Sequence, residues 1–263
     1  MLELYYFPTA TCGYKARLAL AEKQVEFTHR VLDRDAGDLL TPHYLKLNPN
    51  AVVPTMVHDG AVLIESSIIM VYTDEAFDGP SLRPAAALGR ARAAAWLKRA
   101  DDHLPALGAV TYGTFRRKEI LTKPDEELAS YYAAIPDPER RAQRRAVIEQ
   151  GVEAPLVSAG YRALDRLFAS MNDQLYSQTY LTGTGYGLAD AALTPFVSRL
   201  DELGMAWMWD KRPHLAGWWD NVRRRPSFET VFAAYPDPAR KAGLRAAGEE
   251  AAGRVKAIIL AGD

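Results

Sequence analysis

The chain has 263 residues, of which 48% are hydrophobic and 25% are charged, and this is the composition of an ordinary globular protein with a large core. Its 32 basic and 33 acidic residues leave a formal charge of −1, which argues against a general nucleic-acid binder, because such a protein needs a basic excess. The single cysteine excludes an internal disulfide and a multi-cysteine zinc site, but not a reactive thiol.

Strand and helix signals alternate over the first eighty residues. A run of large apolar residues ends at Pro8, which is typical of a buried strand followed by a turn. The Asp59-Gly60 pair lies between two apolar segments and predicts a hairpin, and Ser66 is a suitable N-cap for the helix that follows. The order β-α-β and then β-β-α predicts a small mixed sheet with helices packed on it. The predicted elements are strand 2–7, helix 13–24, strand 25–32, strands 54–57 and 61–64, and helix 66–77.

Strand signals largely stop after the short linker 78–81, and the rest of the chain is predicted to be helical. The predicted fold is therefore an α/β domain over residues 1–80, an all-helical domain over 86–240 and a tail over 241–263. The helices are expected over 88–107, about 140–171, 188–203, 213–224 and 227–234, with a surface helix or frayed tail over 237–263.

Four motifs carry a resemblance to a known family. They are YFPTATCG at 6–13, LNPNAVVPT at 47–55, IESSII at 64–69, and YLTG at 180–183 continuing to GLAD at 187–190. In this order and spacing the chain resembles the glutathione transferase superfamily, which implies a thioredoxin-like domain followed by a helical bundle. Residues 122–155 look like an insertion of the bacterial β-etherase-like branch, which cleaves aryl ether bonds of lignin-derived compounds with glutathione.

The resemblance implies how glutathione would be held. Val53-Pro54 stands where the family has a cis proline, whose preceding residue presents its backbone to the cysteinyl part of glutathione, and this would be strand addition by a tripeptide. Glu65 and Ser66 begin a predicted helix, where free N–H groups favour an anion such as the γ-glutamyl carboxylate, and Glu65 could face the ligand's ammonium group. The alternatives are a trans proline that opens an edge strand and an ordinary serine N-cap.

The loop after the first strand is expected to hold the chemistry. The thiolate of glutathione is the nucleophile, and a donor at a helix N-terminus would stabilise it. Members of the family use Tyr, Ser or Cys at slightly different positions, so Cys12 and Thr11, then Thr9 and then Tyr6 are the candidates. The β-etherase-like members have an Asn-Ser pair at Cys12-Gly13, and glycine offers no side-chain donor. Tyr6 as a core aromatic and Cys12 as a small buried hydrophobe remain open.

The electrophile is expected to bind to aromatic side chains of the helical domain. Tyr112, Phe115 and Trp207 are the candidates for this pocket, although such residues are often ordinary core residues. An anionic substrate could use the Arg116-Arg117-Lys118 cluster, whereas the arginines at 140–145 are expected on a solvated face. No metal is expected, because none of the five histidines has metal-ligand spacing with another.

The sequence therefore predicts a glutathione transferase whose bound thiolate attacks a hydrophobic or aromatic electrophile, with aryl ether cleavage as the specific reaction. Two alternatives stay open: a glutathione-dependent thiol reductase that uses Cys12, and a non-catalytic binding protein. Gly13 and the apolar Ala51-Val52 favour the latter. No apolar run is long enough to span a membrane and the chain starts with a strand, so a cytoplasmic protein is expected. The family implies a homodimer.

Overall fold

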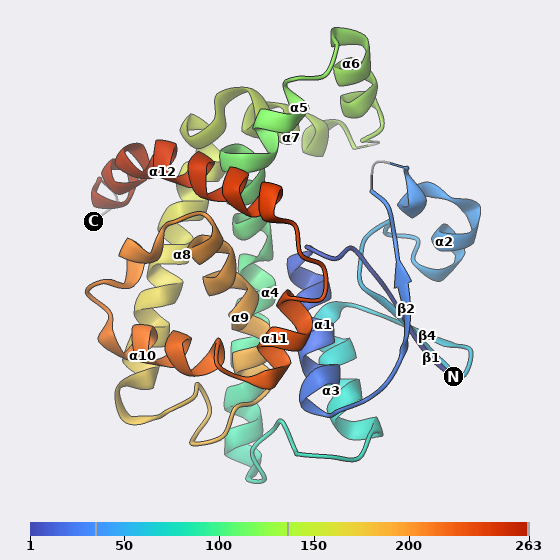
Figure 1. The fold of residues 1–263 in the computed structure, drawn as a ribbon, viewed down its shortest axis with the longest axis vertical. Helices are drawn as coiled ribbons and strands as arrows, with labels where there is room; N and C mark the ends of the chain where they lie inside the picture. The colour runs from blue at the N-terminus through green and yellow to red at the C-terminus, as the bar shows by residue number, and fades with distance from the viewer. Residues whose placement is uncertain (35, 136, 262–263) are drawn as a thin grey trace. The chain divides into compact units, whose positions relative to one another are not determined.

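A computed structural model describes residues 1–34, 36–135 and 137–261. Within them, four strands alternate with helices near the start of the chain, and the rest of the chain is helical (Figure 1). The strands are β1 (Leu2–Tyr6), β2 (Thr28–Val31), β3 (Thr55–His58) and β4 (Ala61–Ile64). The α-helices are α1 (Thr11–Glu22), α2 (Pro42–Leu47), α3 (Ser66–Ala76), α4 (Ala87–Thr111), α5 (Arg117–Ile120), α6 (Asp125–Ala133), α7 (Pro138–Gln150), α8 (Pro155–Gln174), α9 (Leu188–Glu202), α10 (Pro213–Val222), α11 (Pro226–Phe232) and α12 (Pro238–Leu260).

The chain forms two compact units, and each is assembled from separate stretches of sequence. The unit that contains the sheet also includes helical segments from late in the chain. The first unit comprises Met1–Ala100, Leu175–Val197 and Gly217–Pro236, and the second comprises Asp101–Gln174, Ser198–Ala216 and Asp237–Asp263.

The sheet of the first unit has the strand order β2-β1-β3-β4. β1 pairs in parallel with β2 and antiparallel with β3, and β3 pairs antiparallel with β4. Helices α1 and α3 cover one face and α2 lies on the other (Figure 1). The predicted β-α-β and β-β-α order, and with it the thioredoxin-like domain, is confirmed. Strand β2 is shorter than predicted, because only Thr28–Val31 pair with β1.

Alternation along β1 decides which side chains enter the core. Leu4 and Tyr6 are fully buried and pack with Leu20 and Ile69 on the helix-covered face. Tyr5 points to the opposite face, where its ring centre lies 5.9 Å from that of Tyr44 in α2.

The register of the sheet gathers three loops at one end. Thr55 is paired with Tyr5 on one side and with Ile64 on the other. β4 therefore ends in the row in which β3 begins, and β1 ends one residue beyond this row. At this end of the sheet the chain passes from β1 to α1, enters β3 from the 48–54 segment, and passes from β4 to α3. These three connections contain the three N-terminal motifs.

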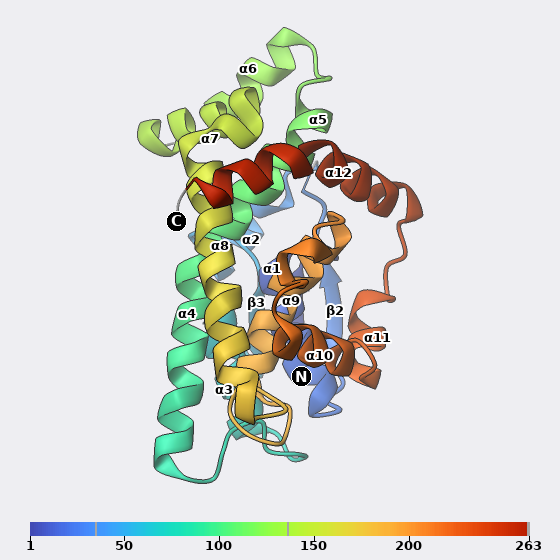
Figure 2. The ribbon, with the colours of Figure 1, turned by 90° about the vertical axis from the view of Figure 1, so that its left-hand side faces the viewer.

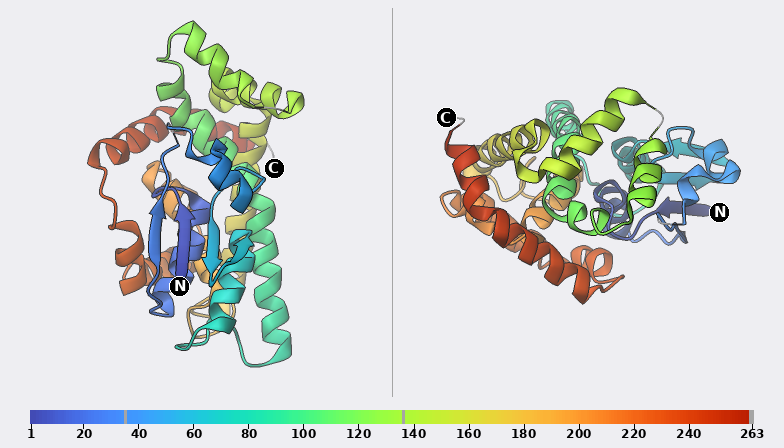
Figure 3. Two further views of the ribbon diagram at one scale, coloured as in Figure 1. Left: turned by 90° about the vertical axis from the view of Figure 1, so that its right-hand side faces the viewer. Right: turned by 90° about the horizontal axis from the view of Figure 1, so that it is seen from above.

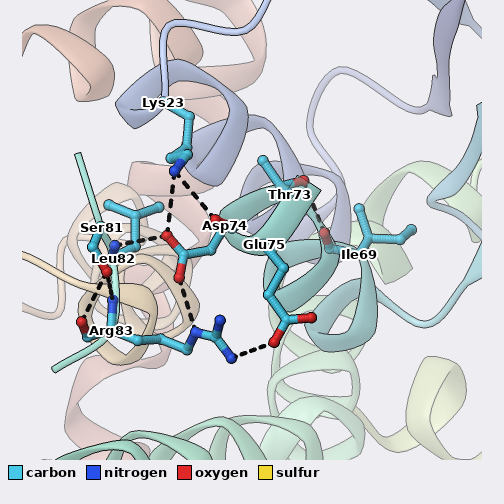
Figure 4. A network of polar contacts seen from close by, with 8 residues as sticks. All are labelled: Lys23, Ile69, Thr73, Asp74, Glu75, Ser81, Leu82 and Arg83. Carbon is cyan, nitrogen blue, oxygen red and sulfur yellow. Dashed lines mark hydrogen bonds and ion pairs between the residues drawn. The ribbon is translucent and has the colours of Figure 1, made fainter. Parts of the chain in front are cut away.

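A buried ion pair joins α1 and α3 at their other ends (Figure 4). The Nζ atom of Lys23 lies 3.6 Å from Oδ1 of Asp74, and both side chains are 3% exposed. Asp74 also accepts hydrogen bonds from the backbone N–H of Leu82 at 2.8 Å and from Nε of Arg83 at 2.8 Å. A buried carboxylate requires such partners. The network fixes the segment that leads out of α3.

A second buried carboxylate, that of Asp190, organises the start of α9. It accepts hydrogen bonds from the backbone N–H groups of Leu181 at 2.9 Å and Gly187 at 3.0 Å, and from Nε1 of Trp218 at 2.8 Å. Gly187 directly precedes α9. A Cβ atom there would lie 2.6 Å from the carbonyl oxygen of Leu82, so the close approach of the chain requires glycine. Asp190 is thus structural.

The second unit is helical. Helix α4 continues into a π-helical segment, η2 (Tyr112–Arg116), and α12 runs across α8 (Figure 2). Helices α6 and α7 follow η2 and pack against each other (Figure 3). The single helix predicted over 140–171 is wrong. It is divided into α7 and α8 around Gly151, which has a φ of 61°, and Pro155 begins α8. In the described residues no helix is long and apolar enough to cross a membrane.

Replacing Asp190 tests its structural role. Asp190→Ala leaves three buried N–H donors without an acceptor, and we expect a loss of about 3–5 kcal/mol in the free energy of unfolding. Asp190→Asn keeps one acceptor oxygen and should lose less. Urea unfolding followed by circular dichroism measures both, and a loss below about 1 kcal/mol for the alanine variant would contradict this role.

The contribution of Asp190 should also depend on pH. Burial raises the pKa of Asp190 to about 6, against the effect of its hydrogen bonds. Because the unfolded chain releases this proton near the ordinary value of 3.8, the native state binds more protons between these values, and stability falls as the pH rises through this window. The advantage of the wild type over Asp190→Asn should therefore be roughly 2 kcal/mol greater at about pH 4.5 than at pH 7. Urea midpoints at both values check this, and an equal advantage at both would refute it.

Candidate active site

The first turn of α1 presents polar groups at the end of the sheet. Ala10 is the N-cap residue, and because alanine has no side-chain oxygen it makes no capping bond to the N–H groups of the helix. Thr11 and Cys12 follow and are both half-buried. The Thr11 hydroxyl has no hydrogen-bond partner in the described chain. Gly13 packs tightly beneath them, since a Cβ atom there would lie 3.3 Å from the Cβ of Tyr6.

A buried arginine of α1 binds the loop that precedes this helix. The buried guanidinium of Arg17 donates to the carbonyl oxygen of Pro8 at 3.3 Å and to that of Val231 at 2.7 Å. Its central carbon also lies 4.8 Å from the ring centre of Tyr6 and 5.3 Å from that of Tyr235. Arg17 therefore fixes the position of Pro8, and with it the loop that contains Thr9.

The hydroxyl of Tyr6 is already hydrogen-bonded to other side chains of the core. It lies 2.7 Å from Nδ1 of His29 and 2.7 Å from the hydroxyl of Tyr235. Burial raises the pKa of Tyr6, and the hydrogen bond with Tyr235 adds to this shift. Burial lowers the pKa of His29, and the positive charge of Arg17 contributes. The phenol of Tyr6 is thus a neutral, fully buried group of the core network.

The turn before β3 is built by two buried residues that the sequence did not single out. The Tyr44 hydroxyl donates to the carbonyl oxygen of Val52 at 2.6 Å, and the Asn48 amide donates to the same oxygen at 2.9 Å. Asn48 also donates to the hydroxyl of Thr55 at 3.1 Å. The Val53–Pro54 peptide bond is cis, as predicted. Val53 lies beyond the last paired residue of β3, so the ladder does not use its backbone groups.

The start of α3 completes this end of the sheet. Glu65 is the exposed N-cap residue, with a φ of 71° and no side-chain capping bond, and Ser66 is the first helical residue. Neither side chain has a polar partner in the described chain. Next to them, Nζ of the fully buried Lys15 donates to Oγ of Ser67 at 2.8 Å. This bond joins α1 to the first turn of α3.

At one end of its sheet, the unit thus has three segments with polar groups that have no hydrogen-bond partner in the described chain. Two helices start there, with the Thr11 hydroxyl and the buried Ser66 hydroxyl, and the segment at Val53, which pairs with no strand, lies between them in the strand order. An extended ligand could pair with this segment while its anionic groups lie at the helix starts. In the described part of the chain, no group of three or more His, Cys, Asp or Glu side chains is arranged to hold a metal ion.

The aromatic candidates of the second unit lie in different surroundings. Tyr112 is half-buried, and the guanidinium carbon of Arg144 lies 3.7 Å from its ring centre. Phe115 is buried, and Trp207 is half-buried with Nζ of Lys256 5.0 Å from its ring centre. In the described chain no ring contact joins Trp207 to either of the other two.

Comparisons with known proteins agree with this architecture. The family model "Glutathione S-transferase, N-terminal domain" matches residues 11–76, and "Glutathione S-transferase, C-terminal domain" matches residues 131–226. The chain is 29% identical to Protein LigF of Sphingobium sp. strain SYK-6 over 88% of this chain and 93% of that protein. It is 27% identical to the tetrachloro-p-hydroquinone reductive dehalogenase of Sphingobium chlorophenolicum, over 88% of this chain and 95% of that enzyme.

Among solved structures, the crystal structure of beta-etherase LigF from Sphingobium sp. strain SYK-6 superimposes with a TM-score of 0.79 at 27% identity, over 89% of this chain and 99% of that one. The two family models cover the segment from α1 to α3, with strands β2 to β4, and much of the helical segment, in the expected order. The chain belongs to the glutathione S-transferase superfamily.

Proposed function

We propose that the protein is an enzyme that binds glutathione at the end of its sheet and uses the thiolate to attack an aromatic electrophile. The observation that carries this proposal is the set of uncommitted groups at Thr11, Val53, Glu65 and Ser66, in a chain of this superfamily. In this proposal residues 1–80 bind glutathione and 86–240 bind the electrophile, with Tyr112, Phe115 and Trp207 in its pocket. A cytoplasmic homodimer completes it.

Each group has a role in binding. The backbone of Val53, presented next to Pro54, pairs with the cysteinyl part of glutathione as an added strand residue. The γ-glutamyl carboxylate lies at the N-terminus of α3 and accepts a hydrogen bond from the Ser66 hydroxyl. The exposed Glu65 carboxylate faces the ammonium group of the ligand.

The thiol is activated at α1. A free thiol is mostly protonated at pH 7, and lowering its pKa by roughly two units requires roughly 2.7 kcal/mol. A hydrogen bond from the Thr11 hydroxyl and the positive end of α1 can supply this. Cys12 and Thr9 are the other candidates in the loop. Tyr6 is the weakest, because its hydroxyl is already bonded to His29 and Tyr235.

The electrophile is of aromatic character. In the proposed reaction the thiolate sulfur forms a bond to the carbon that carries a leaving group, and the leaving group departs with the bonding electrons. For an aryl ether that group is a phenolate. Similarity to beta-etherase LigF and to the reductive dehalogenase supports an aromatic substrate, and the former favours ether cleavage.

The first test is the Thr11 hydroxyl. Thr11→Val removes the donor while it keeps the shape of the side chain. We expect kcat/KM for conjugation of 1-chloro-2,4-dinitrobenzene at pH 6.5 to fall by about 10²-fold. The pH profile should move to higher pH, because the bound thiol then ionises later. The measurement is kcat/KM from pH 5.5 to 9.

Two matched variants separate Thr11 from its neighbours. Cys12→Ala should keep the activity and its pH profile, whereas a thiol reductase with a Cys12 nucleophile would lose its activity in this variant. Tyr6→Phe should leave the pH profile in place. An unchanged profile for Thr11→Val, together with a shifted one for Cys12→Ala, would assign the donor to Cys12 instead.

The second test concerns Glu65. Glu65→Gln should weaken glutathione binding by about three- to tenfold in calorimetry, because an ammonium loses its partner at a partly exposed site. N-acetylglutathione lacks this charge, so its affinity should be the same for both proteins. Glu26→Gln, an exposed carboxylate of the same unit, is the control. Equal losses for both ligands would exclude the contact, and no binding of glutathione by the wild type would exclude the proposed function.

A further inference from the structure

Buried polar atoms without a partner are concentrated in one part of the second unit. In the described chain five buried side-chain nitrogen or oxygen atoms lack a hydrogen bond, and three of them are Nε of Arg116, Oη of Tyr132 and Nη1 of Arg144. Buried polar groups are nearly always paired, so each exception requires an explanation. Two arginines and a tyrosine from one small region are not explained by the apolar packing around them.

The three residues border one apolar cluster. Tyr132 forms this cluster with Ile120 and Ile148, and Tyr112 packs against it. Arg144 lies one turn before Ile148 on α7, and its guanidinium lies over the Tyr112 ring at 3.7 Å. Arg116 lies one turn after Tyr112 in the η2 segment. The unpartnered groups therefore come from η2, α6 and α7, the helices around the predicted substrate aromatic Tyr112.

Neighbouring cations are already paired, but Arg144 is not. In the described chain no carboxylate lies within ion-pair distance of Arg144, although its N–H group is buried. Its neighbours have the following partners: Arg116 pairs with Glu119, Arg117 donates to the carbonyl oxygens of Ile148 and Glu149, Lys118 pairs with Glu250, Arg141 donates to the carbonyl oxygen of Ile135, and Arg145 pairs with Glu149.

The chemistry of the three atoms specifies the ligand. The two guanidinium nitrogens only donate and the Tyr132 hydroxyl can also donate, so an acceptor with several lone pairs satisfies all three. A carboxylate matches the planar fork of a guanidinium, and the Tyr112 ring holds that fork flat. We propose that Arg144, supported by Arg116 and Tyr132, binds the carboxylate of an aromatic substrate. This inference rests on the proposed function for the reaction, but the binding site is testable without it.

Binding is measured first, with a pair of probes that differ only in charge. 3,5-Dinitrobenzoate has the carboxylate, and 3,5-dinitrobenzamide is its neutral counterpart. In calorimetry the wild type should bind the benzoate about tenfold more tightly than the amide. Arg144→Met should remove this preference, and Arg144→Lys, which keeps the charge but not the fork, should retain part of it.

Arg145→Met is the matched control. Arg145 is the next residue of α7 and also lies over a tyrosine ring, that of Tyr132, at 4.6 Å, but it is paired with Glu149. We expect this variant to keep the tenfold preference. Equal affinity of the wild type for both probes, or the same loss in Arg144→Met and Arg145→Met, would overturn the inference.

The reaction is measured second, with 4-chloro-3,5-dinitrobenzoate and its amide. The glutathione sulfur replaces chloride on the ring carbon, and chloride leaves with the bonding electrons. The preference for the benzoate should appear in KM and disappear in Arg144→Met. Conjugation of both compounds without a preference would refute the carboxylate site alone. Tight binding of dinitrobenzoate without any release of chloride would refute the proposed function and leave the site in place.

Discussion

The register of the four-stranded sheet is the constraint on which the candidate site depends. Thr55 pairs with Tyr5 on one side and Ile64 on the other, so β3 begins in the row in which β4 ends, and β1 ends one residue beyond this row. A shift of β3 by one residue would turn its buried side chains to the opposite face and move its turn away from the helix starts. The buried contacts of Met56, which is fully shielded, oppose such a shift.

Much of this arrangement is readable in the sequence. Local signals identified the strands, because the Asp59-Gly60 turn and the apolar run before Pro8 are short-range features. The family motifs pointed to the cis bond at Val53. The sequence did not indicate the support beneath these motifs. No role was predicted for Asn48 or Tyr44, yet both donate hydrogen bonds to the Val52 carbonyl oxygen, and only the fold brings them to it.

The arginines of α7 show where helical periodicity is insufficient. The arginines at 140–145 have the spacing of a solvated helix face, and for Arg145, which is 54% exposed, that reading is correct. Arg144 differs from it only in direction, because one residue of a helix is a turn of about 100°. Periodicity could not decide this, since the ring beneath its guanidinium, that of Tyr112, is distant in the sequence. The break at Gly151 was missed for a similar reason, because a left-handed glycine leaves little trace in an otherwise helical composition.

The hydrogen bonds of Tyr44 and Asn48 to the Val52 carbonyl have a dynamic consequence. These bonds connect α2 and its C-cap residue, on the outer face of the sheet, directly to the turn that precedes Pro54. Fluctuations of that helix and of the turn are therefore correlated. Any ligand that immobilises the turn also slows amide exchange in α2, so that exchange in this helix reports on the occupancy of the backbone contact next to Pro54.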